Sequence, residues 1–273
     1  MPISMTFYNE VHPKLRKYIR YFWHTTGQVD KNTYQQLLPM DHVDLIIRSK
    51  GSFQYIIDNE AVKTENVSFV GIRQHSVDLV HDDYIESFGV SFEPWGFYPF
   101  INTSLSAFTN KAVNFSEVNP SLTLNLEELV HEKRSISDRI NLIEDVLIKH
   151  LEVNKTYLES IEVIKDFIDI NSEVDKVTVK EFCNERALQR RKLERNFNKY
   201  VGVSPKDFLR IRQFEDTSRF VMDESTTLLT EIAYEGEYYD QPHFAKTFKK
   251  YTAYTPSQFK KESPALKSKM TFK

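Results

Sequence analysis

An internal repeat near the C-terminus limits what this chain can fold into more than any other feature. Residues 193–208 (LERNFNKYVGVSPKDF) align with residues 244–259 (FAKTFKKYTAYTPSQF) at a constant offset of 51 positions. Each copy reads as a helix, a turn and a Ser-Pro or Thr-Pro pair that opens a further helix, because the hydroxyl suits an N-cap and proline suits the first helical position. The identical pairs are Phe197 and Phe248, Lys199 and Lys250, Tyr200 and Tyr251, Pro205 and Pro256, and Phe208 and Phe259.

A short helix precedes each copy, over residues 178–184 in the first and 228–235 in the second. A short helix, a turn and a second helix form the helix-turn-helix pattern, which therefore occurs twice. Between the copies, residues 205–222 predict one continuous helix about 27 Å long. Successive major-groove entries on one face of DNA lie about 34 Å apart, so this helix can hold two DNA-reading helices one turn apart. A scaffold repeat is the alternative, but solenoids need three or more units.

The outward faces of the two second helices carry cationic and polar side chains. Arginine reads guanine in the major groove and lysine neutralises phosphate. A charged solvent face is common on any helix, so the repetition of the pattern is what favours DNA binding. At 100° per residue, the apolar sides consist of Leu193, Phe197 and Tyr200 and of Phe244, Phe248 and Tyr251, and the opposite sides consist of Arg191, Arg195 and Asn198 and of Pro242, Lys246 and Lys249.

Charge is distributed unevenly along the chain, whose net charge is −3. Residues 1–159 contain 15 Lys+Arg and 21 Asp+Glu, a balance of −6, whereas residues 176–273 contain 20 and 13, a balance of +7. A basic excess in the last part of the chain is expected if that part binds a polyanion. A solvated basic surface remains the alternative.

The N-terminal part reads mainly as short strands. Apolar residues alternate over 53–57 and 88–92, and further β-rich runs cover 43–47, 67–72 and 76–80. Many short strands favour a small sandwich or barrel. Residues 13–23 read as an early helix or helical turn. Helices are then predicted over residues 136–151 and 157–170, whose apolar residues recur every three or four positions.

We therefore predict an α+β protein. An N-terminal β-rich barrel or sandwich-like domain with flanking helices covers residues 1–153, and it serves as a sensor or dimerisation domain. A C-terminal all-α domain of two helix-turn-helix motifs joined by a long helix covers residues 157–263, and residues 264–273 form a tail. The apolar stripe of residues 136–151 is either a dimer seam or a strut packed on its own domain.

Several classes of protein are excluded or disfavoured by missing motifs. The single cysteine, Cys183, excludes a disulfide framework and a cysteine zinc cage. The chain contains no GxGxxG, GxxxxGK[ST], GxSxG, HExxH or His-x-His, so we expect no enzyme, no cofactor and no metal. No apolar run approaches the ~20 residues of a membrane span, and the N-terminus is unlike a signal peptide. We expect a cytoplasmic protein without membrane contact.

Residues 157–261 resemble the DNA-binding domain of the AraC/XylS family of transcription regulators. The strongest match is IAYEGEYYDQPHFAKTFKKYTAYTPSQF (232–259), followed by EFCNERALQRRKLERNFNKYVGVSPKDFLRIR (181–212). The resemblance implies a sequence-specific DNA-binding regulator that presents two recognition helices to successive major grooves. We predict DNA contacts by Gln189, Arg190, Arg191, Glu194, Arg195, Asn198, Gln241, His243, Lys246, Lys249 and Lys250, and contacts to the DNA backbone by Ser204, Lys206, Thr255 and Ser257.

Some positions depart from the family pattern. Glu237 and Ala253 stand where the family has turn glycines, so strain is expected at the helix end near Ala253. Gln189 stands where a Ser or Thr cap is usual, and Cys183 where alanine is usual. Pro242 has no backbone N–H to donate to a base, so the second recognition helix is expected to contact mainly the DNA backbone.

The N-terminal part resembles a domain of unassigned function found ahead of such helix-turn-helix domains. The matching stretches are LLPMDHVDLIIRS (37–49) and SFGVSFEPWGFYPFINTSLSAFTN (87–110). The wider family often carries a cupin-like β-barrel there, which binds a small effector, dimerises, or does both. The resemblance implies double-stranded DNA as a partner, a small-molecule effector, a homodimer and, for an activator, RNA polymerase.

Aromatic clusters mark where an effector would bind in this part. Tyr21 to Trp23 form one cluster, and the segment from Trp95 to Phe100 forms another. Aromatic walls with a few polar groups are typical of small-molecule pockets, so we place an effector pocket at Trp23, Trp95, Phe97 and Tyr98. The alternative is that these aromatics form the core. An effector-independent regulator whose first domain binds a protein partner is the alternative function.

Overall fold

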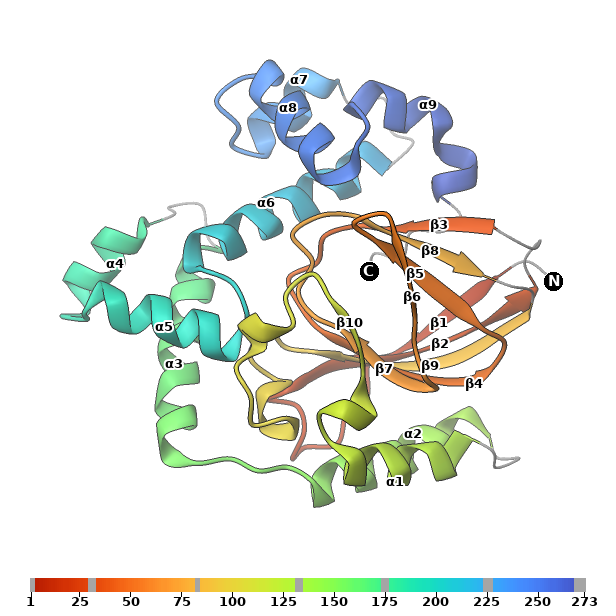
Figure 1. Ribbon diagram of the computed structural model, residues 1–273. Coiled ribbons are helices and arrows are strands. Elements are labelled where there is room, and N and C mark those ends of the chain that lie inside the picture. Colours follow the sequence, from red (N-terminus) through yellow and green to blue (C-terminus); the bar gives the residue numbers. More distant parts are fainter. Residues whose placement is uncertain are drawn as a thin grey trace.

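The computed structural model confirms the predicted fold class, with two antiparallel sheets in the N-terminal part and helices in the C-terminal part (Figure 1). It describes residues 3–28, 33–81, 84–130, 135–172, 177–222 and 228–267. The predicted tail over 264–273 lies outside the described residues from 268 onward, and α9 continues to Lys267.

The two sheets face each other and form a β-sandwich. The larger sheet has the order β1-β2-β9-β4-β7-β10, and the smaller has the order β3-β8-β5-β6. Every pair of neighbouring strands in the described residues is antiparallel, and most of these neighbours, such as β2 with β9 and β4 with β9, are far apart in the sequence. The strands are β1 Ser4–Tyr8, β2 Ile19–Gln28, β3 Thr33–Leu37, β4 Asp44–Lys50, β5 Phe53–Ile57, β6 Glu60–Lys63, β7 Val67–Val70, β8 Val77–His81, β9 Tyr84–Phe92 and β10 Ala112–Asn114.

Strand β9 shows how alternating residues build the two faces of the larger sheet. Phe88, Val90 and Phe92 point into the main core, which the helices α1 (Pro120–Val130) and α2 (Ile136–Lys149) help to cover. Gly89 lies on the opposite face beneath the indole of Trp23, where a Cβ atom would come within 1.8 Å of that ring. The small residue at this position therefore lets Trp23 lie flat in the space between the sheets.

The apolar stripe of residues 136–151 packs within the chain. Ile140, Ile143 and Leu147 of α2 are buried in the same core as Leu122 and Leu126 of α1. The sequence left two alternatives for this stripe, a dimer seam or a helix packed on its own domain. The structure has the second, because these side chains are covered by their own chain.

The predicted early helix over residues 13–23 is wrong beyond its first turn. Residues 13–18 form a turn, and residue 19 begins β2. The reason is a non-local contact: β2 pairs with β9 from Ile19 to Gln28, and this ladder outweighs the local helical pattern. The strands predicted over 43–47, 53–57, 67–72, 76–80 and 88–92 are present as β4, β5, β7, β8 and β9.

Seven further helices follow in the described part of the chain after residue 150. The first motif consists of α4 (Val179–Glu185) and α5 (Arg190–Tyr200), and the second motif of α7 (Leu229–Glu235) and α8 (Gln241–Thr252). Helix α6 joins them with the predicted bounds, Pro205–Met222. Helix α3 (Lys155–Ile170) precedes the first motif, and α9 (Pro256–Lys267) follows the second. None of the helices in the described ranges is long and apolar enough to cross a membrane.

The turn of the second helix-turn-helix motif is one residue longer than the turn of the first motif. Helices α4 and α7 begin 50 residues apart, whereas α5 and α8 begin 51 apart. Ala187 and Glu237 occupy the same left-handed turn position, with φ of 51° and 57°. The extra residue of the second motif therefore lies between this turn and α8. Glu237 takes the conformation for which the family uses glycine, and Gly236 beside it does not.

The two motifs attach to the β-sandwich differently. The side chains of α5 belong to the same continuous core as the larger sheet, whereas the second motif has its own core, which includes Leu38 from the end of β3. Figure 1 shows α7, α8 and α9 above the sheet edge formed by β3 and β8, well away from α4 and α5.

Candidate DNA interface and ligand cavity

The exposed face of α5 presents the side chains predicted to read DNA. Gln189 is the N-cap of α5 and makes no capping hydrogen bond with its side chain, as its departure from Ser or Thr implies. Glu194 is half-buried and accepts a hydrogen bond from Arg190 at 2.9 Å. The other predicted contacts of this helix are all exposed: Gln189, Arg190, Arg191, Arg195 and Asn198.

The opposite face of α5 fixes the helix in place. Leu193, Phe197 and Tyr200 are buried, and the ring of Phe197 lies 5.4 Å from that of Phe167 and 5.8 Å from that of Phe208. Aromatic contacts of this kind hold a helix at a defined angle. The packed face therefore holds the helix in place, and its cationic side chains lie on the opposite, exposed face, as the positions at 100° per residue predicted.

Helix α8 repeats this arrangement with different ends. Asp240 caps it by accepting a hydrogen bond from the backbone N–H of His243 at 2.7 Å. Ala253 ends it in the left-handed conformation at φ 66°, where the family has glycine. Its buried face consists of Phe244, Phe248 and Tyr251, and its predicted DNA contacts Gln241, His243, Lys246, Lys249 and Lys250 are all exposed.

The residues predicted to contact the DNA backbone lie at the starts of α6 and α9. Ser204 and Thr255 use their hydroxyls as N-caps, accepting from the N–H of Asp207 at 3.1 Å and of Gln258 at 3.3 Å. Lys206 and Ser257 are exposed in the first turns. Helix N-termini carry partial positive charge and bind phosphate well, so these positions suit the predicted contact.

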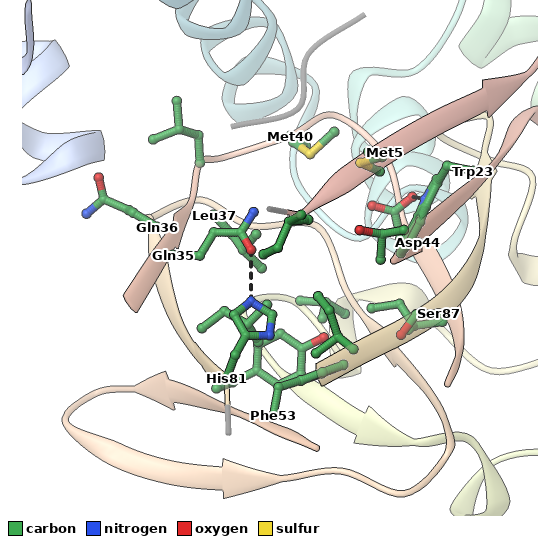
Figure 2. Close-up of a pocket in the computed structure, with 18 of the residues that line it drawn as sticks. Met5, Trp23, Gln35, Gln36, Leu37, Met40, Asp44, Phe53, His81 and Ser87 are labelled. Carbon is green, nitrogen blue, oxygen red and sulfur yellow. Dashed lines mark hydrogen bonds between the residues drawn. The ribbon is translucent and has the colours of Figure 1, made fainter. Parts of the chain in front are cut away.

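A cavity of about 200 Å³ lies between the two sheets of the β-sandwich (Figure 2). Its walls come from both sheets and are mostly apolar. In Figure 2, Asp44, Trp23 and Ser87 lie on one side of the cavity, and Gln35 and His81 lie on the other. The apolar lining residues are Ile3, Met5, Phe7, Leu37, Leu38, Met40, Ile46, Phe53, Val70, Leu79 and Ile85.

Polar groups meet the cavity at several places. Asp44 Oδ1 accepts hydrogen bonds from Ser91 Oγ and, at 3.4 Å, from Trp23 Nε1. On the other side, His81 Nε2 and Gln35 Oε1 lie 3.0 Å apart. Arg73 also lines the cavity and donates from Nε to the carbonyl of Leu38 at 3.1 Å.

Of the four predicted effector-binding residues, the structure brings only Trp23 to this cavity. Trp95 is buried and donates from Nε1 to the carbonyl of Lys17 at 2.9 Å. Phe97 packs against Phe69 and Phe92 in the main core, and Tyr98 packs against tyrosines of the helical part. These three residues serve the core, which was the stated alternative for the aromatics.

The cavity residues that the sequence did not predict include Asp44, Tyr55, Arg73 and Ser87. For Ser87 a signal was present in β9, where small residues at Ser87, Gly89 and Ser91 alternate with large apolar ones. Such alternation leaves space on one face of a sheet.

Strand β3 forms a wall shared by the cavity and the second motif. Gln35, Gln36 and Leu37 all line the cavity, and the side chain of Gln36 extends away from those of Gln35 and His81 (Figure 2). Gln36 Nε2 donates to the carbonyl of Thr252 at the end of α8, at 3.1 Å. Leu38 packs into the core of the second motif. A nearby bond from the N–H of Ser76 to the carbonyl of Tyr251, at 3.0 Å, adds to this contact.

A buried ionic cluster forms a second contact between the β-sandwich and the helical part. Arg20 donates to both carboxylate oxygens of Asp41, at 2.6 and 3.0 Å, and to Glu93 at 3.0 Å. From α6, Glu215 accepts a hydrogen bond from the backbone N–H of Asp41 at 3.3 Å, and Arg212 Nε lies 3.8 Å from Asp41 Oδ2.

The carboxyl groups of this cluster have opposite pKa shifts. Burial disfavours the charge on Asp41, but the charge of Arg20 and hydrogen bonds from His42 and Arg20 outweigh burial and hold the pKa of Asp41 well below its usual range. Burial, together with the negative charge of Asp41, raises the pKa of Glu215 to about 7. Within the cluster, Asp41 therefore stays ionised at neutral pH, whereas the carboxyl of Glu215 changes its charge near neutral pH.

Within the described ranges, one group of residues could hold a metal ion by its ligand atoms: Asp41, His42 and Glu215, whose atoms lie within 4.8 Å of one another. The guanidinium of Arg20 already occupies both oxygens of Asp41. A divalent cation would have to displace that positive charge, so the group is better described as an ion-pair cluster.

The first motif is joined to the β-sandwich side of the chain by a cluster of tyrosines. The ring of Tyr98 lies 5.5 Å from that of Tyr157 and 4.7 Å from that of Tyr200. Thr109 Oγ1 donates to the carbonyl of Gly202, after α5, at 2.6 Å. These contacts are apart from the cavity, since none of the five residues lines it.

Two parts of the chain match known families. Residues 182–262 match the helix-turn-helix domain family, and residues 10–114 match a domain of unknown function (DUF6597). The matches confirm both resemblances that the sequence motifs indicated. No curated protein matches the sequence.

The solved structures to which this chain is similar include two of ToxT and one of CuxR. ToxT from Vibrio cholerae is 13% identical over 95% of this chain and 98% of that chain, with a TM-score of 0.49. A structure of ToxT from the same organism with bound unsaturated fatty acid is 14% identical over 88% and 94%, with a TM-score of 0.43. The AraC-like transcriptional activator CuxR is 14% identical over 78% and 86%, with a TM-score of 0.28.

Proposed function

We propose that this chain is a transcription regulator of the AraC family, which recognises a specific DNA sequence through both helix-turn-helix motifs under the control of a small molecule. The observation that carries the proposal is the repeated geometry of α5 and α8. Each helix has a buried aromatic face and an exposed cationic face. The expectation that the chain is not an enzyme agrees with its family, whose regulators are not enzymes.

The two recognition helices have different roles in this proposal. On α5, Arg191 and Arg195 are exposed, and neither forms an ion pair with any described residue, so both are available for bases. On α8, Pro242 occupies the first turn, and the exposed cations Lys246 and Lys249 suit phosphates. We therefore assign base reading mainly to α5 and backbone contact mainly to α8.

Selection of random duplex DNA by the purified protein, followed by sequencing, tests this function. At about 0.15 M salt, non-specific phosphate binding is weak enough for a preferred site to be enriched. We expect a site with one well-defined block of bases and a second, less defined block about one helical turn away. Absence of any enriched site, with and without a mixture of metabolites, would contradict sequence-specific binding.

Strand β3 supports control of the second motif rather than the first. The residues from Gln35 to Leu38 all line the cavity, and two of them, Gln36 and Leu38, also hold α8 and its core, so a molecule in the cavity would contact residues that hold the second motif. A shift of β3 would therefore move the second motif, while the tyrosine contacts of the first motif would stay unchanged. The result would be a ligand-dependent spacing or angle between the two DNA-reading helices.

An effector-independent regulator whose β-sandwich binds a protein partner is the second candidate. Thermal stabilisation by metabolites separates the two, because a ligand that binds only the folded state raises its unfolding temperature. A homodimer, contact with RNA polymerase in the case of an activator, and a cytoplasmic location are further parts of the proposal. Sedimentation with and without DNA tests the dimer.

A further inference from the structure

The cavity between the sheets carries polar groups whose arrangement defines the chemistry of its ligand. We propose that it binds an uncharged molecule the size of one aromatic ring that carries both a hydrogen-bond donor and an acceptor, as a primary carboxamide does. The inference rests on the proposed function only in treating the ligand as a regulator, and binding itself is measured without DNA.

The size of the cavity sets the size of the ligand. An engineered apolar cavity of about 150 Å³ stays dry and binds benzene. The cavity here measures about 200 Å³ and has an aromatic and aliphatic wall that includes Phe53, Ile46 and Leu79. It therefore has room for one ring and a small polar substituent, and too little room for a long acyl chain or a sugar dimer.

Asp44 provides the acceptor for a ligand donor. Its Oδ1 is engaged by Ser91 and Trp23, with His42 Nε2 at 3.7 Å, whereas no described residue bonds to its Oδ2. Ser87, which lies on the same side of the cavity (Figure 2), is 2% exposed, and its hydroxyl has no partner. A buried hydroxyl without a partner is costly, so both groups favour a ligand that donates a hydrogen bond here.

Tyr55 and Arg73 provide donors for a ligand acceptor. Tyr55 is fully buried, its hydroxyl has no partner, and burial raises its pKa above the usual range, which keeps it a neutral donor. Arg73 is 4% exposed and uses Nε to bind the Leu38 carbonyl, while its two terminal nitrogens bond to no described residue. Arg73, Tyr55 and Asp44 all line the same cavity.

The charges of Asp44 and Arg73 argue for an uncharged ligand. The two side chains are opposite in sign and make no ion pair with each other, although both line the cavity. A carboxylate ligand would pair with Arg73 but repel Asp44, and a cation would do the reverse, each in a site shielded from water. A neutral group with a donor and an acceptor bridges both without adding charge to the interior.

Three ring-matched probes test the proposal: benzamide, benzoate and benzamidinium, which are neutral, anionic and cationic. Binding to the full-length protein is measured at neutral pH by calorimetry and ligand-observed NMR. We expect benzamide to bind about tenfold more tightly than either charged probe, since each of those leaves one buried charge unpaired. Stronger binding of benzoate or benzamidinium, or no binding of any probe, overturns the proposal.

Two variants localise the binding and check its electrostatic basis. Asp44→Asn keeps the shape but removes the negative charge, so the preference should move from benzamide toward benzoate. Leu79→Phe should fill the cavity and abolish binding, and Gln54→Phe, which adds an aromatic ring at a position on β5 that does not line the cavity, is its matched control. Unchanged benzamide binding by the Leu79→Phe protein would place the site elsewhere and overturn the proposal.

The failure of the ligand class and the failure of the proposed function give different results. If benzamide binds and the selected DNA site is bound equally well with and without it, the cavity chemistry stands and control by the ligand is refuted. If no probe binds while the DNA selection still yields a site, the regulator stands and the ligand class is refuted.

Discussion

Replacing Glu215 with glutamine tests whether the buried ionic cluster couples the second half of the chain to the β-sandwich in a pH-dependent way. Glu215 lies on α6 and accepts a hydrogen bond from the backbone N–H of Asp41. The groups around it are the carboxylate of Asp41, the ring of His42, and the cations Arg20 and Arg219. Glutamine has the same shape and keeps an acceptor oxygen, so the substitution removes only the titrating proton and the charge.

The magnitude follows from the pKa of Glu215, which burial raises from 4.5 to about 7. The difference of about 2.5 corresponds to about 3 kcal/mol at 1.36 kcal/mol per pH unit. Because the folded-state pKa is the higher one, the protonated carboxyl favours the folded state. This contribution is fully present below about pH 4.5 and is lost as the pH rises toward 7, where the buried carboxyl ionises beside Asp41.

The wild-type protein should therefore be less stable at pH 8 than at pH 5, and Glu215→Gln should remove much of this difference. At pH 8 the variant should gain up to about 3 kcal/mol, or roughly 6–10 °C in Tm for a chain of this size. At pH 5 the two proteins should unfold at nearly the same temperature. Scanning calorimetry at both pH values measures the effect, and Asp216→Asn, at an exposed position of the same helix, is the control.

An equal shift of Tm at pH 5 and pH 8 would refute the reasoning, because a titrating group has to act differently on the two sides of its pKa. A loss of stability at pH 8 would also refute it. That result would mean that the ionised carboxylate is held favourably by the cations of the cluster, and that the pKa of Glu215 is not raised.

Three further predictions concern DNA binding and the helix ends. Replacing both Arg191 and Arg195 with alanine should weaken specific binding by about 1–3 kcal/mol per lost base contact and non-specific binding less, as measured by competition titrations; equal losses would assign both residues to phosphates. Gln36→Ala should alter footprint protection at the second block of the site and leave the first unchanged, whereas Thr109→Val should do the reverse; identical footprints would refute separate attachment of the motifs. Ala253→Gly should stabilise the protein by up to about 1 kcal/mol in thermal unfolding, because it relieves a left-handed residue that is exposed, and a destabilised variant would show that the alanine methyl is needed.

The helical part of the fold was the most predictable from the sequence, since its signals are local. Phe197 and Phe248 recur at helical spacing with their neighbours, and each Ser-Pro or Thr-Pro pair begins a helix where expected. The left-handed turn at Ala187 was not predicted, because alanine gives no sign of it. Only the alignment with Glu237 in three dimensions reveals that the two residues are equivalent.

The β-sandwich was predictable in type and less so in detail. Alternation identified β5 and β9, but β2 was hidden because the segment around Tyr18 and Ile19 also fits a helical turn. Its strand conformation depends on pairing with β9, whose paired residues lie 56 to 73 positions further along the chain. The pattern of apolar residues within one segment does not show which distant strand the segment will pair with. Long-range pairing of this kind therefore determines whether such a segment is a helix or a strand.

The ligand cavity shows the same limit for function. Trp23 and Trp95 look equivalent in the sequence, since each stands in an aromatic cluster. What separates them is Gly89, which makes space for the Trp23 indole, and the Lys17 carbonyl, which binds the Trp95 indole inside the core. The aromatic residues therefore predicted a buried apolar region, whereas the small residues of β9 determine where that region contains a cavity.

The different attachment of the two motifs follows from these non-local contacts and bears on regulation. The first motif shares one continuous apolar core with the β-sandwich, so separating it would expose large apolar surface. The second motif is held by hydrogen bonds from Gln36 and Ser76, by Leu38, and by an ionic cluster with one titrating carboxyl. Directional polar contacts fail with small displacements, whereas apolar contacts tolerate them. Any signal that moves β3 should therefore release or reorient α8 before it affects α5, and the weaker DNA reader should be the regulated one.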